Sequence, residues 1–302
     1  MGIRSFDRER DLAAILSLVG RSRERRDPGA IFHPGGLQWW LRRLGRARFD
    51  VPVLSDPVGV VGFALRDGSD VIVQADPEHS AARAELLAWI EARTRETNHD
   101  ELLLSVVEDD GDLQGAALAR GYEPTESYGY ELVHDDLGRD PGPPELPPGF
   151  QIISLTPALT EAYIELHRAA WSRPDRPSTY DRHQHDLVTA MPDFRYDLVP
   201  IVATSDGKLA AYCMSWWDAR SAAVEIEPLG THPDFRRKGL ARAIVREVLR
   251  RSWMIRAKYV LVWGTSENPE AKALYLSAGL RIRSVLRNHR LLLDRADARR
   301  FT

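Results

Sequence analysis

The sequence predicts an α/β protein made of two similar domains in tandem, and three observations point to it. The chain has 302 residues, which suits two domains of about 150 residues each. A proline-rich stretch at 140–149 divides the chain almost in half and is expected to be an extended linker. The predicted strands and helices follow the same order on both sides of it. We therefore expect one domain over 1–139 and a second over 150–302.

The elements of each half follow from apolar spacing and turn residues. A strand opens each half, an amphipathic helix follows, and then come two strands joined by a turn, a further strand leading into a helix, and a closing strand, short helix and strand. In the first half the predicted elements are a strand at 2–6, a helix around 12–19, strands at 51–54, 58–65 and 71–75, and a helix at 81–95. In the second half they are a strand at 150–155, a helix around 159–170, strands at 198–203, 209–216 and 223–231, and a helix at 239–251.

The composition excludes several classes of protein. The net charge of −3 argues against a general nucleic-acid binder. No apolar run is long enough to cross a membrane, and the first residues lack the apolar core of a secretory signal. The lone Cys213 cannot form an internal disulfide, which fits a reducing compartment. We expect a cytoplasmic protein, monomeric or homodimeric, that binds neither nucleic acid nor membrane.

A basic turn at 236–241 is the first candidate binding site. A predicted strand ends near Thr231, and a helix is expected to start near Gly239. The first amides of a helix have no internal partner and form a natural phosphate site. The turn supplies three cations followed by three small or apolar residues: Arg236, Arg237, Lys238, Gly239, Leu240 and Ala241. The alternative is a solvated basic turn before an ordinary helix.

A second segment, at 268–275, supports the interpretation of the turn at 236–241 as a binding site. Asn268 is a good helix N-cap, and the following Pro269 suits the first helical position. Ala271 and Tyr275 lie one turn apart on the same helix face, so the small alanine leaves room for a ligand beside the phenol. The alternative for Tyr275 is a core aromatic residue on an amphipathic helix.

Together these segments resemble the signature of the GNAT N-acetyltransferase superfamily. That signature is Arg/Gln-x-x-Gly-x-Gly/Ala after a strand, followed by Asn-x-x-Ala-x-x-x-Tyr, and both parts occur here in that order. The tandem layout is similar to that of the mycothiol synthases. The resemblance implies two GNAT-like domains, each with a mixed, mostly antiparallel sheet flanked by helices. It also implies acetyl-CoA as the cosubstrate, a small primary amine as the acceptor, and no metal.

The resemblance implies roles for individual residues. The backbone at 236–241 would bind the CoA pyrophosphate, and the strand Leu229, Gly230 and Thr231 would pair with the pantetheine arm. The amide of Leu229 or Gly230 would polarise the thioester carbonyl. Asn268 would lie near the pantetheine, and Tyr275 would protonate the leaving thiolate.

The general base is left open between two glutamates and water. Glu225 and Glu227 alternate with Leu229 and Thr231, so all four are expected to share one face of the strand. Either carboxylate can take a proton from the amine, directly or through water. The alternative is that the two glutamates are half-exposed strand carboxylates without a catalytic role. His232 is a weaker candidate for the base, and it is expected to belong to the turn.

The first half lacks the same residues. Matching Pro77 to Pro233 places Ser80, Arg83 and Glu85 where the second half has Arg236, Gly239 and Ala241, and Ala117 stands where Tyr275 does. We therefore expect a degenerate GNAT-like domain over 1–139 and the catalytic domain over 150–302. The rival reading is a non-catalytic acyl-CoA-binding regulatory protein.

The acceptor cleft is expected along 171–197 and at the end of the next strand. Candidate residues are Arg173, Tyr180, His183, His185, Phe194, Trp216, Trp217 and Asp218. Aromatic and acidic side chains suit a small cationic amine. At least one of Trp216 and Trp217 is expected to be ordinary core.

Overall fold

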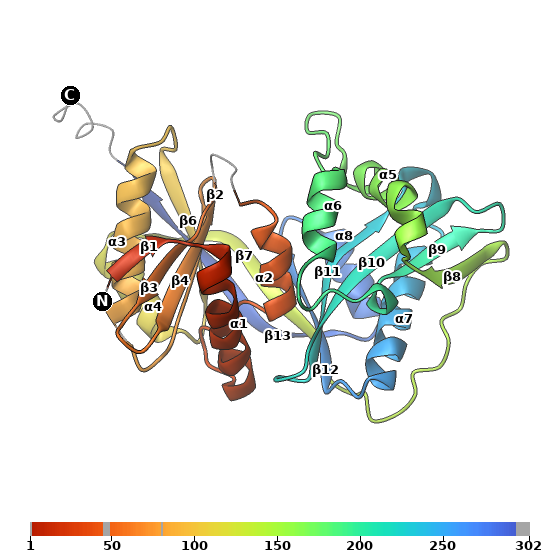
Figure 1. The fold of residues 1–302 in the computed structure, drawn as a ribbon, viewed down its shortest axis with the longest axis horizontal. Helices are drawn as coiled ribbons and strands as arrows, with labels where there is room; N and C mark the ends of the chain where they lie inside the picture. The colour runs from red at the N-terminus through yellow and green to blue at the C-terminus, as the bar shows by residue number, and fades with distance from the viewer. Residues whose placement is uncertain (1, 45–48, 80, 294–302) are drawn as a thin grey trace.

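The computed structural model describes residues 2–44, 49–79 and 81–293. The first half contains the following elements (Figure 1): β1 (Gly2–Ser5), α1 (Arg8–Arg25), α2 (Pro34–Leu41), β2 (Phe49–Asp50), β3 (Pro52–Ser55), β4 (Val60–Asp67), β5 (Asp70–Ala75), α3 (Ala81–Arg95), β6 (Glu101–Val107), α4 (Gly111–Ala119) and β7 (Glu123–His134). The predicted order of elements in this half is confirmed.

The second half repeats that order after the linker. It contains β8 (Phe150–Ser154), α5 (Thr160–Trp171), α6 (Arg182–Thr189), β9 (Pro200–Thr204), β10 (Leu209–Asp218), β11 (Ala223–Thr231), α7 (Leu240–Met254), β12 (Tyr259–Thr265), α8 (Pro269–Ser277) and β13 (Arg281–Leu292). Three short 3-10 helices lie at Pro157–Leu159, Tyr196–Leu198 and Pro233–Phe235.

All strands join one sheet in the order β1-β3-β4-β5-β6-β13-β7-β12-β11-β10-β9-β8, with β2 beside β4. Among the described strands, only β5–β6 and β11–β12 pair in parallel. The predicted mixed, mostly antiparallel α/β architecture is therefore confirmed. The last helix of each half, α4 or α8, is followed by a glycine, Gly121 or Gly279, that has a positive φ of 85° or 97°.

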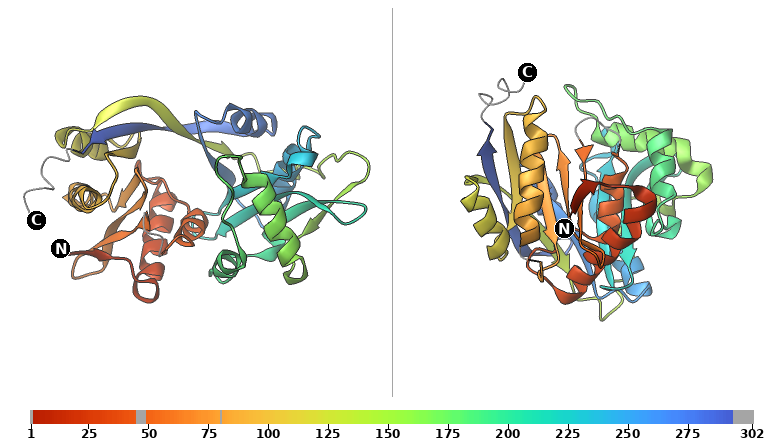
Figure 2. Two further views of the ribbon diagram at one scale, coloured as in Figure 1. Left: turned by 90° about the horizontal axis from the view of Figure 1, so that it is seen from above. Right: turned by 60° about the vertical axis from the view of Figure 1, so that its left-hand side comes forward.

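The last strands of the two halves change places. Strand β7, from the first half, pairs with β12, and β13, from the second half, pairs with β6. Figure 2 shows these two long strands running side by side across the molecule. Hydrogen bonds alone thus do not separate the halves at 140–149, and the boundaries at 139 and 150 stay a prediction.

The second half packs a helix layer on each face of its sheet. On one face, α5 and α6 share a core with α1 and α2 of the first half, and Trp39 and Trp216 are buried there. On the other face, α7 and α8 cover a core that includes Leu240 and Tyr275. No helix in the described part of the chain is both long and apolar enough to cross a bilayer.

Candidate functional site

The N-terminus of α7 carries a run of free backbone amides. Within the described residues, the amides from Arg237 to Arg242 donate to no carbonyl or side chain. Helices α1, α2, α4, α6 and α8 have side-chain caps, but the N-cap of α7 is Gly239, which provides none. Six unpaired donors at the positive end of a helix form a strong anion-binding site.

The backbone of this turn is held in an uncommon conformation. Arg237 and Gly239 both have left-handed φ angles, of 62° and 79°. A side chain at position 239 meets no neighbour, so the positive φ is what favours glycine there. Arg236 anchors the turn, because its Nη2 donates to the Ala170 carbonyl at 3.0 Å and its Nε to the Thr231 carbonyl at 3.3 Å.

Beside this turn, the sheet opens. Strands β11 and β12 pair only from Ala223–Tyr259 to Glu225–Leu261. Beyond that point β12 continues against β7, and β11 continues against β10. The strand segment 229–231 therefore has a backbone edge without a partner strand on the β12 side. Gly230 leaves no room for a side chain, since a Cβ there would lie 2.6 Å from the Tyr212 ring.

The expected shared face of Glu225, Glu227, Leu229 and Thr231 is wrong. Cys213 pairs with Leu229, but Ser215 pairs with Ile226, so β11 has one extra residue and a bulge between them. The bulge reverses the alternation: Leu229 packs in the α7–α8 core together with Val224 and Ile226. The two glutamates lie on the other face, towards α2.

Tyr275 lies on α8, in the core against which Leu229 packs. Its side chain is only 7% exposed, and its hydroxyl makes no hydrogen bond to the described residues. Burial raises the pKa of the phenol well above its usual value, and the charges of Cys213, Glu227 and Tyr130 raise it further. The phenol therefore remains protonated, as a proton donor must. Asn268 caps α8 by accepting from the Ala271 amide at 3.1 Å, as predicted.

Glu225 lies beneath the first half of the chain. It is 4% exposed, and a Cβ on Gly36 would lie 2.1 Å from its Oε2. This oxygen has no hydrogen bond and is 3.5 Å from the Nδ1 of His33, which itself accepts from the Gly35 amide. Burial raises the pKa of Glu225 well above its usual value. Glu225 is therefore an interface residue with a raised pKa, away from the open edge.

Glu227 is the more accessible of the two carboxylates. Its side chain is partly exposed. Burial raises the pKa of its carboxyl group, whereas the charges of Arg42 and Arg43 and a hydrogen bond from Trp39 act to lower that pKa. These three residues all come from the end of α2 or just after it. Glu227 is also close enough for its charge to raise the pKa of Tyr275.

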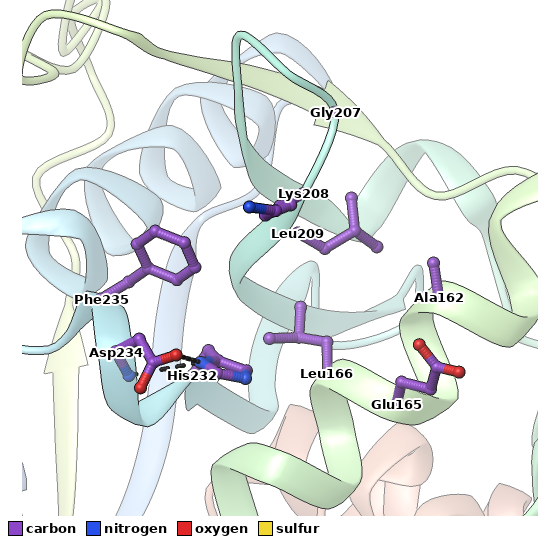
Figure 3. Close-up of a pocket in the computed structure, with 9 residues that line it drawn as sticks. All are labelled: Ala162, Glu165, Leu166, Gly207, Lys208, Leu209, His232, Asp234 and Phe235. Atoms are coloured by element: carbon purple, nitrogen blue, oxygen red, sulfur yellow. Dashed lines mark hydrogen bonds and ion pairs between the residues drawn. The ribbon is translucent and has the colours of Figure 1, made fainter.

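Two hollows flank the basic turn. One, of about 530 Å³, lies between the linker and the first turns of α7, where it is lined by Lys238, Arg242 and Arg246. Arg246 holds the linker in place by donating to the Pro141 carbonyl at 2.8 Å. The other hollow, of about 400 Å³, lies between α5 and the β9–β10 turn, with Glu165, Lys208, His232 and Asp234 around it (Figure 3). There His232 accepts from the Asp234 amide at 3.2 Å, so it belongs to the turn.

The matching opening in the first half is filled by its own chain. Strands β5 and β6 also pair over three residues and then separate. Ile31 packs into this region against Val107 and Leu286. The helix start is occupied too, because Arg83 pairs with Asp110 at 3.2 Å and both are buried. Ser80, matched above to Arg236, lies outside the described residues.

The predicted acceptor residues divide into two groups. Tyr180 and His185 are buried together, with the Tyr180 hydroxyl 3.1 Å from the His185 Nδ1, whereas Arg173 and His183 are exposed. Trp216 is fully buried core, as expected for one of the two tryptophans. The sequence pattern missed Tyr163, His167 and Trp39. Tyr163 and His167 fall within the helix predicted around 159–170 and were given no role there, and Trp39 comes from the other half of the chain.

No group of three or more potential metal ligands lies within the described residues. Known proteins are similar to this chain in sequence over part of its length and in fold over almost all of it. The model of the acetyltransferase (GNAT) family matches residues 157–280. No curated protein matches the sequence significantly.

Solved structures match along almost the whole chain. A GCN5-related N-acetyltransferase from Sphaerobacter thermophilus is 19% identical, with a TM-score of 0.62 over 97% of this chain and 95% of that one. A tandem GNAT protein from the clavulanic acid biosynthesis pathway is 16% identical, with a TM-score of 0.63 over 98% and 99% of the two chains. An acetyltransferase of the GNAT family from Colwellia psychrerythraea is 12% identical, with a TM-score of 0.60 over 96% and 100%. These identities establish the shared fold alone. The match to the GNAT family model lies within the second half of the chain, and the whole chain has the fold of these structures, which include a tandem GNAT protein.

Proposed function

We propose that the second half transfers an acetyl group from acetyl-CoA to the primary amine of a small molecule. The observation that carries this proposal is the run of six unpaired amides at the start of α7, beside the open edge of β11. The amides and the cations around them suit a pyrophosphate, and the edge suits an amide-bearing arm that extends the sheet. The first half, whose opening is filled, has a structural role and shapes the acceptor side.

The reaction proceeds by direct attack. The amine nitrogen forms a bond to the thioester carbonyl carbon, and the C–S bond breaks. The amide of Leu229 or Gly230 stabilises the charge that develops on the carbonyl oxygen. Tyr275 gives its proton to the leaving thiolate, and Glu227, directly or through water, takes the proton of the nitrogen. Glu225, which is buried against Gly36, contributes to the interface instead.

The test is release of free CoA from purified protein supplied with acetyl-CoA and a panel of amines. We expect turnover with at least one amine and a new acetyl-amine product by mass spectrometry. Tight binding of acetyl-CoA without turnover across the panel would favour the rival function, a non-catalytic acyl-CoA-binding regulator. Tyr275 argues against that rival, because a protein that only binds has no need of a proton donor at this position.

A further inference from the structure

Five buried aromatic side chains gather where the second half meets α2. Tyr163 and His167 come from α5, His185 from α6, Tyr212 from β10 and Tyr180 from the segment before α6. None is more than 4% exposed. The His167 ring stacks on Tyr180 at 3.9 Å between centroids, and the rings of Tyr163 and Tyr212 are 4.9 Å apart. We call these five residues the aromatic cluster.

Several polar atoms of the aromatic cluster have no partner among the described residues. They are the Tyr163 hydroxyl, both ring nitrogens of His167 and the Nε2 of His185. The remaining polar atoms are used, since Tyr180 bonds to the His185 Nδ1 and Trp171 donates to the Tyr212 hydroxyl at 2.9 Å. Protein interiors pair nearly all buried polar groups, because an unpaired one costs stability. Four unpaired atoms in one cluster therefore indicate a place for hydrogen-bonding groups of a ligand.

Helix α2 connects the aromatic cluster to the reacting centre. Trp39 lies 5.7 Å from the His167 ring and 5.8 Å from the Tyr180 ring, and it also hydrogen-bonds Glu227. The Arg42 guanidinium lies 3.5 Å above the Trp39 ring. A molecule that contacts both the cluster and Glu227 would thus touch both halves of the chain.

We infer that the acceptor binds between α2 and α5, with its amine at Glu227 and its hydroxyl groups on Tyr163, His167 and His185. The acceptor is therefore a hydroxylated amine that carries no second positive charge. This inference rests on the proposed function and names its substrate class. It also gives the first half a part in the site, since Trp39 and Arg42 form the wall opposite α5.

The electrostatics of the aromatic cluster support this class. Burial, with the charge of Arg42, lowers the pKa of His167 to about 3, and burial lowers that of His185. Both imidazoles are therefore neutral, and each unpaired nitrogen is a donor or an acceptor. A hydroxyl group can do both, so it suits these partners and the phenol of Tyr163. The nearby guanidinium disfavours a polyamine.

The acceptor would enter from the segment before α6. Residues 171–177 are exposed, and Tyr180 is the member of the aromatic cluster that neither a helix nor a strand holds. Moving its ring breaks the bond to His185 and uncovers His167, on which it stacks.

His167→Phe and Tyr163→Phe test the inference, because both remove polar atoms and keep an aromatic ring. The probes are glucosamine as the hydroxylated amine, cyclohexylamine as its plain counterpart and spermidine as the polyamine. The wild type should favour glucosamine. In each variant, the ratio of kcat/KM for glucosamine to kcat/KM for cyclohexylamine should fall about tenfold below the wild-type ratio. This is the effect expected from the loss of one hydrogen bond to the substrate. Thermal stability should stay equal or rise, and the Kd for acetyl-CoA should not change. Tyr122→Phe, in the core of the first half, is the matched control.

Each other outcome has a distinct meaning. An unchanged ratio of kcat/KM values in a more stable variant would make the aromatic cluster ordinary core and overturn the inference. A wild-type preference for spermidine would overturn the substrate class. Absence of turnover with every amine would instead remove the proposed function itself. If His167→Phe does not fold, Tyr163→Phe, which loses a single oxygen atom, gives the same reading.

Discussion

Replacing Tyr275 by phenylalanine separates its chemical part from its structural part. The ring is buried in the α7–α8 core beside Leu240 and Ala278, and phenylalanine preserves those contacts. The hydroxyl bonds to none of the described residues, so its removal breaks no hydrogen bond in the fold. We expect the free energy of unfolding to change by no more than about 0.5 kcal/mol.

The effect on turnover should be much larger. A positioned acid contributes about 10²- to 10⁴-fold to a rate, or about 3 to 5 kcal/mol at about 1.4 kcal/mol for each factor of ten. The pKa of Tyr275 is raised by burial, so the phenol is a weaker acid than in water and the thiolate must share the same poorly solvated site. We therefore expect kcat near the lower end of that range, about 10²-fold below the wild type.

Steady-state release of CoA, followed with a thiol reagent, measures this effect. The KM and Kd for acetyl-CoA should change less than about threefold, because the lost interaction matters mainly in the transition state. Tyr130→Phe is the matched control, since its buried hydroxyl also has no partner in the described chain. If kcat for Tyr275→Phe stays within about threefold of the wild type, Tyr275 is not the acid.

Three further predictions concern the turn, the buried ion pair and the interface. Gly239→Ala should raise the Kd for acetyl-CoA about tenfold, as measured by calorimetry, because alanine at a φ of 79° is strained by about 1 kcal/mol or more. The control is Gly68→Ala, which places alanine at a φ of 69° in a turn of the first half and should leave that Kd unchanged. Arg23→Met should lower the free energy of unfolding, measured in urea, by about 3 to 5 kcal/mol. The substitution removes the 2.8 Å ion pair with Glu131 and two hydrogen bonds to backbone carbonyls. A loss below about 1 kcal/mol would contradict this prediction. The pKa of Glu225 is raised in the folded chain, so this group's contribution to stability is lost as the pH rises above its unfolded pKa of about 4.3. Glu225→Gln should therefore gain stability relative to the wild type between pH 5 and 8, an expectation that parallel pH-dependent unfolding curves would refute.

Local sequence determined the elements and the turn. The positions of α7 and α8 follow from apolar spacing and from residues that act within a few positions of themselves, such as Asn268 as a cap and Gly239 at a positive φ. The free amides of α7 follow from the absence of a capping side chain at Gly239. Such short-range features depend on the backbone alone, which is why a single sequence reveals them.

Long-range contacts were decided by the tertiary structure. The alternation rule put Glu225 and Leu229 on one face, but a bulge, which depends on pairing with β10, separated them. The exchange of β7 and β13 is equally invisible to hydrophobic periodicity, because either strand has an apolar pattern that fits either half.

By itself, the sequence determined that the second half has a helix start suited to a phosphate, and that a tyrosine lies on the next helix, after one intervening strand. The tertiary structure alone decided what surrounds them. It placed Trp39 and Arg42 of the first half beside Glu227 and left four polar atoms of the aromatic cluster unpaired. The physical reason is that a helix cap depends on neighbours along the chain, whereas burial and pairing depend on residues more than a hundred positions away.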